Sequence, residues 1–140
     1  MRPGTRLAAV LLLPFVASSA FADNVRGRWT APQPWPLIAV HAVLTPDGRV
    51  LTYGTDGNAK QTGLFIYDVW DPSVGGAGVG HVTLNNVTNT DLFCSSQLII
   101  PQNGNIFIGG GDNFVNGNTT NTGNNNSNVY NTTDTTIARG

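Results

Sequence analysis

The most reactive side chain of this 140-residue sequence is its single cysteine, Cys94. One cysteine cannot form a disulfide within the chain, and an exposed free thiol is a liability in an oxidising compartment. The residue type leaves three states open for Cys94: a buried inert thiol, a disulfide to another chain, or a sulfur that is chemically committed elsewhere.

The two histidines, His41 and His81, could also take part in site chemistry, because imidazole is a good copper ligand. His41 lies within an apolar, β-prone run and is expected to be a hydrogen-bonded structural residue. His81 follows the glycine-rich stretch 75–80 and is expected to face solvent. We expect neither to bind a metal. The stretch 75–80 lacks the helix and the Lys-Ser/Thr pair of a phosphate loop, which predicts a linker between strands.

The first 22 residues have the organisation of a signal peptide. Arg2 and Arg6 precede an apolar run at 7–16, and the small residues at 17–22 end in a pattern that signal peptidase accepts after Ala22. The apolar run is shorter than the ~20 residues that a membrane-spanning helix needs. We therefore expect a secreted or periplasmic protein with no membrane attachment after cleavage, the alternative being an uncleaved N-terminal anchor.

The composition predicts an all-β protein. Only 11% of the residues are charged, there is no glutamate and one lysine, and the sequence contains 17 Gly, 16 Asn and 16 Thr. The strongest exposed helix formers are thus nearly absent, whereas residues typical of strands and tight turns are abundant. The formal net charge of −1 gives no basic surface for nucleic acid, so a nucleic-acid-binding function is excluded.

Two hairpins with similar turns indicate an internal repeat. The first joins the apolar runs 38–45 and 49–53 through Asp47-Gly48, and the second joins 95–100 and 105–108 through Asn103-Gly104. Each hairpin is followed by a strand with a central aromatic residue, Tyr67 at 64–68 and Tyr130 at 128–131. The second aromatic strand comes later because a Gly/Asn/Thr-rich insertion, expected to be a polar surface loop, occupies 113–128.

A repeat of about 50 residues with four short strands is typical of a kelch-type β-propeller blade. A closed ring needs at least about four blades, and residues 37–140 provide about two. We therefore expect a signal peptide at 1–22, a lead-in at 23–36, and the N-terminal blades of a longer, truncated propeller at 37–140. The alternative is a small β-sandwich whose spacing is coincidental.

The segment 91–96 (DLFCSS), followed by a hairpin and by the sequence GGGDN at 109–113, resembles the galactose oxidase and glyoxal oxidase family of copper-radical oxidases. The resemblance extends from about Gly27 to the end of the chain. It implies a seven-bladed kelch propeller as the catalytic domain.

The resemblance also implies a role for Cys94. In that family the matching cysteine is joined through its sulfur to a tyrosine ring, which forms a radical cofactor that also binds copper. The enzyme oxidises a primary alcohol or aldehyde, or a carbohydrate substrate, with O2 and releases H2O2. The partner tyrosine and the other copper ligands match no position in this chain, so the isolated chain is expected to be inactive. Tyr130 is expected to be a blade-packing residue and not the cross-link partner.

A second hypothesis stays open. The chain could belong to an exported kelch-type module that binds carbohydrate or protein, in which Cys94 is a buried structural thiol.

Overall fold

The computed structural model describes residue 27 and residues 31–75 and 78–140, so the predicted signal peptide at 1–22 lies outside the described residues. The chain divides into two units, Met1–Ala31 and Pro32–Gly140, and the second contains every described strand. The described residues contain no α-helix, and no helix that could cross a membrane is found among them. The elements are β1 (Ile38–Leu44), β2 (Val50–Thr55), β3 (Ile66–Trp70), the short 3-10 helix η1 (Pro72–Val74), β4 (His81–Asn85), β5 (Ser96–Ile99), β6 (Ile106–Gly109), β7 (Asp112–Val115), β8 (Asn118–Gly123), β9 (Ser127–Tyr130) and β10 (Ile137–Arg139).

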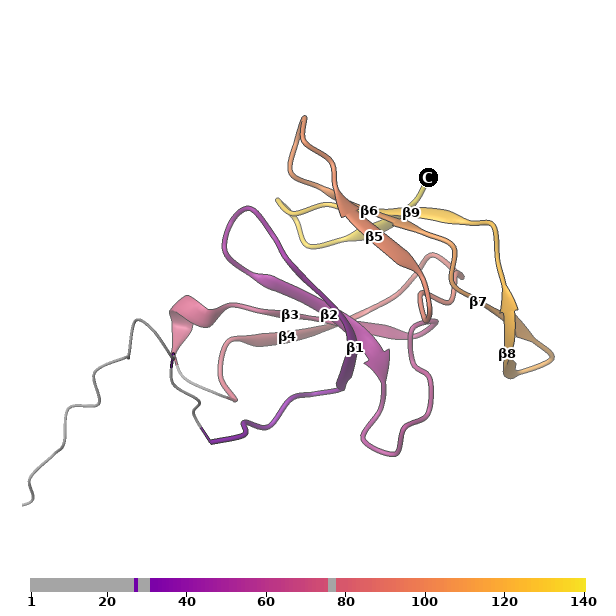
Figure 1. Ribbon diagram of the computed structural model, residues 1–140, viewed down its shortest axis with the longest axis horizontal. Helices are drawn as coiled ribbons and strands as arrows, with labels where there is room; N and C mark the ends of the chain where they lie inside the picture. The colour runs from indigo at the N-terminus through magenta and orange to yellow at the C-terminus, as the bar shows by residue number, and fades with distance from the viewer. Residues whose placement is uncertain (1–26, 28–30, 76–77) are drawn as a thin grey trace, which may run out of the picture. The chain divides into compact units, whose positions relative to one another are not determined.

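The strands form two four-stranded antiparallel sheets and a separate hairpin (Figure 1). Sheet 1 has the order β1-β2-β3-β4, and sheet 2 has the order β10-β9-β6-β5. When the β7-β8 hairpin is set aside, both sheets pair their strands in chain order. The all-β prediction, both predicted hairpins and both aromatic strands are therefore confirmed.

The two hairpin turns close in similar ways and touch one another. The N–H of Thr45 donates to the carbonyl of Arg49 at 2.8 Å, and the N–H of Ile100 donates to the carbonyl of Asn105 at 2.7 Å. A Cβ placed on Gly104 would lie 3.0 Å from Cγ of Pro46, so the turn of sheet 2 packs on the turn of sheet 1.

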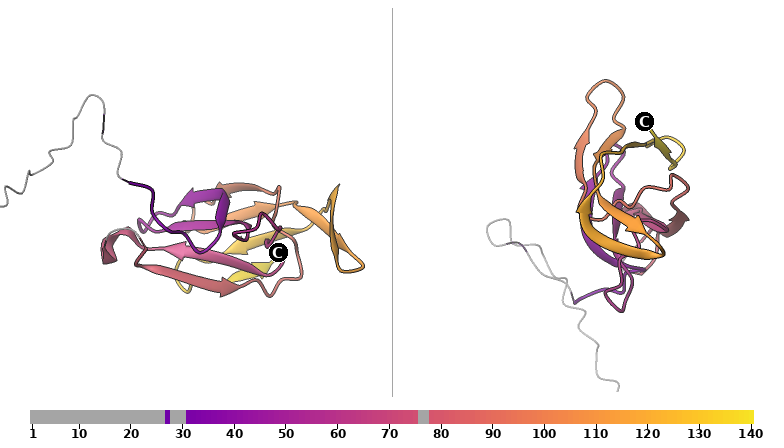
Figure 2. Two further views of the ribbon diagram at one scale, coloured as in Figure 1. Left: turned by 90° about the horizontal axis from the view of Figure 1, so that it is seen from below. Right: turned by 90° about the vertical axis from the view of Figure 1, so that its right-hand side faces the viewer.

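The insertion is not an irregular loop, as the sequence had suggested, but the hairpin β7-β8, which projects from the end of the sheets (Figure 2). Its turn residues Asn116 and Gly117 have φ values of 50° and 80°. Positive φ at both central residues defines a type I′ turn, for which Asn-Gly is the preferred pair. The threonines at 119, 120 and 122 supply β-prone side chains for the return strand.

The core lies between the two sheets. Sheet 1 contributes four of its buried side chains and sheet 2 another four, and Leu92 enters from the loop between β4 and β5. The members are Leu51, Tyr53, Tyr67, Val69, Leu92, Ile106, Ile108, Tyr130 and Ile137. Strand alternation explains this set, because every second residue of β2, β3 and β6 points to the same face.

Apolar side chains also remain exposed on both sheets. On sheet 2, Leu98 pairs with Phe107 on the face opposite the core, and Leu98 is 55% exposed. On the edge strand β1, Val40 is 51% exposed and Leu44 is 63% exposed. Neither sheet closes on itself, so these surfaces are open to further packing.

A bulge in β1 brings backbone atoms of that strand close to Gly54 of β2. The register shifts between Ile38 and His41, and a Cβ on Gly54 would overlap the carbonyl oxygen of Ile38 and lie 2.7 Å from the nitrogen of Val40. We expect Gly54→Ala to lower the free energy of unfolding by about 2 kcal/mol or more, because backbone atoms must move. Urea unfolding followed by circular dichroism measures this loss. Gly57→Ala, where a Cβ meets nothing within 4 Å, is the control, and equal effects of the two changes would contradict the prediction.

Candidate functional site around Cys94

Cys94 lies in the loop that connects sheet 1 to sheet 2, two residues before β5. Its side chain is exposed, and its backbone has a φ of 62°, in the left-handed region that non-glycine residues seldom adopt. In this structure Cys94 is therefore not a buried thiol. The reason is the turn itself, which places Leu92 in the core and Cys94 outside it.

Local hydrogen bonds build this turn. One carboxylate oxygen of Asp91 accepts the N–H of Phe93 at 3.0 Å, and the N–H of Ser95 donates to the carbonyl of Leu92 at 3.2 Å. The carbonyl of Phe93 accepts the N–H of Asp112 at 2.8 Å, which joins the turn to the start of β7. The turn is thus held by its own side chains and by the strand beside it.

His41 on β1 contacts the turn at Cys94. Its Nε2 accepts the backbone N–H of Cys94 at 3.1 Å, and its ring stacks on Tyr53 with centroids 4.9 Å apart and planes at 20°. Phe93 packs edge-on against the same imidazole at 6.2 Å. Burial lowers the pKa of His41, which favours the neutral ring that this acceptor role requires. The expectation of a hydrogen-bonded structural histidine is confirmed.

A second contact between the sheets is made by the hydroxyl of Tyr53. It donates to Oε1 of Gln97 at 2.7 Å and lies 2.9 Å from Oγ of Ser95. Nε2 of Gln97 donates in turn to the carbonyl of Ala42 at 2.9 Å. Burial raises the pKa of Tyr53, so its hydroxyl stays protonated. Sequence reasoning missed this network, because nothing in the local pattern of Tyr53 or Gln97 indicates a contact across 44 positions.

The electrostatic surroundings of Cys94 favour the neutral thiol. Burial of part of the side chain and the nearby carboxylates of Asp112 and Asp91 raise the pKa of the Cys94 thiol. Both carboxylates are buried, at 6% and 2% exposure, and Oδ2 of Asp91 has no hydrogen-bond partner among the described residues. Reactive nucleophilic cysteines need a lowered pKa, so this environment does not suit thiolate chemistry.

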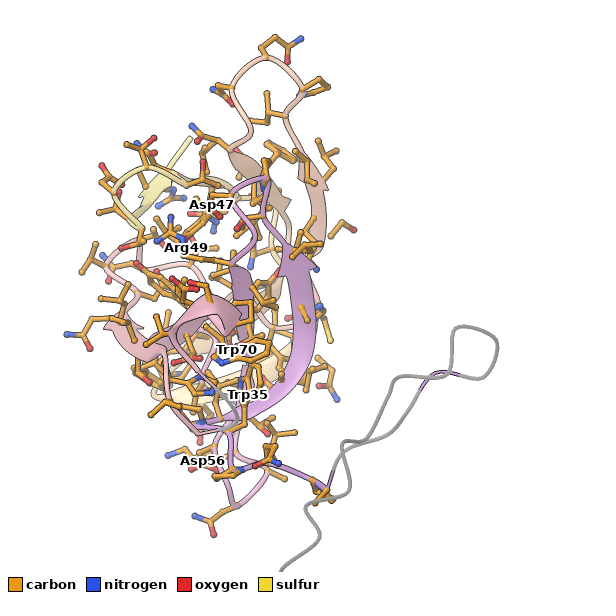
Figure 3. All side chains as sticks on the ribbon, turned by 90° about the vertical axis from the view of Figure 1, so that its left-hand side faces the viewer. Trp35, Asp47, Arg49, Asp56 and Trp70 are labelled. Atoms are coloured by element: carbon orange, nitrogen blue, oxygen red, sulfur yellow. The ribbon has the colours of Figure 1, made fainter. Side chains whose placement is uncertain are left out.

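His81 lies apart from Cys94, at the start of β4. Its Nδ1 is 2.6 Å from Oδ2 of the fully buried Asp68, and its side chain is only 9% exposed. Trp35 packs edge-on against the ring at 4.4 Å and Trp70 stacks on it at 6.1 Å; the two tryptophans lie next to each other in Figure 3. The expectation that His81 faces solvent is therefore wrong, because the lead-in segment carrying Trp35 covers this face of sheet 1.

Tyr130 occupies the core position that the repeat predicts. It is fully buried, and its ring meets that of Tyr67 edge-on, with centroids 6.3 Å apart. Burial raises the pKa of Tyr130 to about 12. Its role as a packing residue between the sheets is confirmed.

The described residues do not contain a group of three His, Cys, Asp or Glu side chains that could hold a metal ion. In the part of the chain that the structure covers, His41 uses Nε2 for Cys94 and His81 uses Nδ1 for Asp68. What the site offers is one exposed sulfur in a fixed turn.

The first test of this geometry is the accessibility of Cys94. A thiol reagent such as 5,5′-dithiobis(2-nitrobenzoate) should titrate one thiol in the folded chain without denaturant, because the side chain is exposed. The rate should be lower than that of cysteines activated by a low pKa. Reaction only after unfolding in urea would contradict the exposed position.

A second test concerns the His41 contact. Because the folded state lowers the pKa of His41 below 6.5, its contribution to stability is complete above that pH and is lost as the pH falls. His41→Phe keeps a ring on Tyr53 but removes the acceptor, which should cost about 1 kcal/mol at neutral pH. The variant should also lose less stability than the wild type between about pH 7.5 and pH 5. Urea unfolding of the two proteins at several pH values measures both the cost at neutral pH and the loss on acidification. Identical dependence of the free energy of unfolding on pH would contradict the role of His41.

No family model, curated protein or solved structure matches the chain. The resemblance to copper-radical oxidases therefore rests on the residues around Cys94 and the repeated hairpins.

Proposed function

We propose that this chain is the N-terminal part of an exported copper-radical oxidase, in which the sulfur of Cys94 forms one half of a Tyr-Cys cofactor. The complete enzyme would oxidise a primary alcohol or aldehyde, the alcohol reaction being RCH2OH + O2 → RCHO + H2O2. The observation that carries the proposal is the position of Cys94: its side chain is exposed at the same end of sheet 2 as Gly140.

The strand register defines that position. Ser96 pairs with Gly109 and Gly109 pairs with Ser127, while the N–H of Gly140 donates to the carbonyl of Ser127 at 2.9 Å. These four residues form one row across sheet 2, and Cys94 lies just beyond its β5 end. Three strand spacings separate the ends of the row, or about 14 Å. A tyrosine that follows Gly140 would thus begin at the same end of the sheet as Cys94.

The two sheets also support a propeller, because equivalent positions of the repeat lie side by side. Tyr67 of β3 contacts Tyr130 of β9, and Pro46 contacts Gly104 in the equivalent turn. Successive blades of a propeller repeat the same element in this way. The exposed apolar face of sheet 2, which includes Leu98, would be covered by a third blade. A seven-bladed kelch ring is the form that we propose for the complete protein.

The reaction that we propose for Cys94 is an oxidative coupling to a tyrosine ring. A carbon–sulfur bond forms while the thiol hydrogen and one ring hydrogen of the tyrosine are removed, and O2 accepts both with two electrons to give H2O2. Copper would supply the metal redox partner for this coupling and for turnover. The described residues of this chain offer no copper site, so the metal ligands are proposed to come from other parts of the protein. This chain contributes the sulfur, and His41 and Tyr53 hold its turn in place.

The test is the mass of the longer protein before and after copper and O2 are added. We expect the wild type to lose two hydrogen masses and to form peroxide with primary alcohols or aldehydes. Cys94→Ser should show neither change, whereas Ser96→Ala, an exposed neighbour in the same segment, should show both. The proposal would be disproved if the mass of the wild type did not change and the Cys94→Ser variant formed as much peroxide as the wild type.

A further inference from the structure

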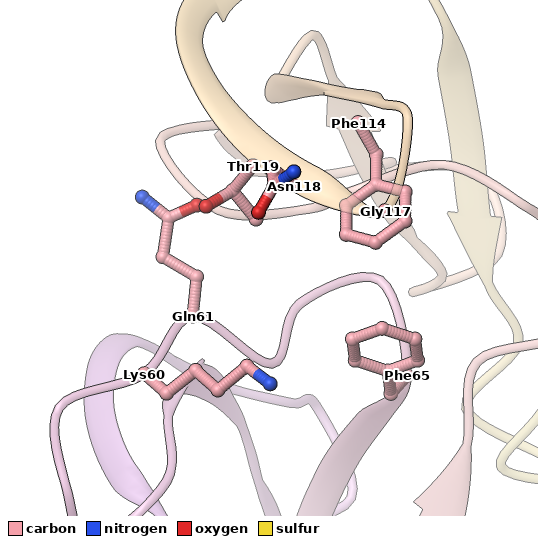
Figure 4. A pocket seen from close by; sticks show the side chains of 7 residues that line it. All are labelled: Lys60, Gln61, Phe65, Phe114, Gly117, Asn118 and Thr119. Atoms are coloured by element: carbon pink, nitrogen blue, oxygen red, sulfur yellow. The ribbon is translucent and has the colours of Figure 1, made fainter.

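A pocket of about 190 Å³ lies between the loop that joins β2 to β3 and the β7-β8 hairpin (Figure 4). The side chains that matter for its chemistry are Lys60, Gln61, Phe65, Phe114, Asn118 and Thr119. Pockets for drug-sized ligands are typically about 300–1,000 Å³. This pocket is smaller and suits a single substituted ring.

Two phenyl rings form its apolar part. Phe65 is 46% exposed and Phe114 is 37% exposed, and their centroids are 5.7 Å apart with the planes at 90°. By contrast, the rings of Tyr67 and Tyr130, which meet between the two sheets, are buried. Phe114 stands in a hairpin otherwise rich in Asn and Thr, so its ring is not needed for a core. Covering these exposed rings with the apolar face of a ligand ring is favourable, because it removes apolar surface from water.

The pocket also holds the one lysine of the sequence. Figure 4 shows the ammonium of Lys60 directed toward the space beside Phe65. The nearby carboxylate of Asp56 accepts the backbone N–H groups of Asn58 and Lys60 through Oδ1, at 2.8 Å and 2.9 Å. Neither ion pair found among the described residues includes Lys60. The ammonium can therefore pair with a negative charge on a ligand.

Amide and hydroxyl groups complete the lining. Nε2 of Gln61 donates to Oδ2 of Asp112 at 3.2 Å, which fixes the amide, and Oε1 of Gln61 has no partner within the described part of the chain. The hydroxyl of Thr119 and the amide of Asn118 also line the pocket. These groups match the hydroxyls of a sugar, which both donate and accept hydrogen bonds.

We propose that this pocket binds a carboxylate-bearing sugar ring, such as a uronic acid residue. Lys60 pairs with the carboxylate, Phe65 and Phe114 cover the C–H face of the ring, and Asn118 and Thr119 bond to its hydroxyls. The site does not involve Cys94, so it can be tested independently of the proposed oxidase function.

The experiment measures binding of three probes to the full chain by calorimetry: D-glucuronate, D-glucose and benzoate. Glucuronate should bind best, since glucose lacks the carboxylate and benzoate lacks the hydroxyls. Its binding should weaken as salt is added, because the pairing with Lys60 is exposed to solvent. Equal binding of glucose or of benzoate would overturn the proposal, and so would binding of none of the three.

Variants locate the site. Lys60→Met should weaken glucuronate binding about fivefold or more, while Lys60→Arg should retain most of it. Phe114→Ser, on the exposed hairpin, should weaken binding as well. Arg139→Met is the matched control, since it removes an exposed cation from β10, and should leave binding unchanged. Glucuronate binding that is unaffected by Lys60→Met would overturn the assignment of the pocket.

Discussion

The burial of Leu92 between the two sheets is the constraint on which the region around Cys94 depends. Leu92 is fully buried in the shared core, although it belongs to neither sheet. Removing such a side chain from water stabilises the fold by about 1.5–3 kcal/mol, enough to hold a loop in one conformation. Because the turn after Leu92 is tight, Cys94 must then face outward, and its left-handed backbone follows from that reversal.

The elements that could be predicted from the sequence are those with local signals. Asp47-Gly48 and Asn103-Gly104 mark hairpins whose strands are only a few residues away, and both were predicted with nearly correct bounds. The β7-β8 hairpin was missed even though Asn116-Gly117 is the same type of signal, because the polar composition of the insertion suggested a loop. Its strands carry few apolar residues, so hydrophobic alternation could not reveal them.

The candidate site was predictable only in part. Cys94 could be singled out by its type and its neighbours, but its partner His41 lies 53 positions away, and the sequence gives no sign of that hydrogen bond. The burial of His81 was equally hidden, because Trp35, which covers it, comes from the lead-in segment. Contacts of this kind depend on how the sheets pack, which local propensity does not determine.

The antiparallel order of the sheets explains why the turn at Cys94 and the pocket at Lys60 lie at the same end. In a meander, alternate connections lie at the same end, so the β2-β3 loop, the β4-β5 loop and the start of β7 are neighbours. Direct contacts confirm this: Gln61 bonds to Asp112, and Asp112 bonds to Phe93 beside Cys94. The opposite end has the tight turns at 45–49 and 100–105 and the longer connection between β3 and β4, which contains η1. Side-chain chemistry can therefore vary at the Cys94 end without disturbing the core, as is usual for loops on a rigid β scaffold.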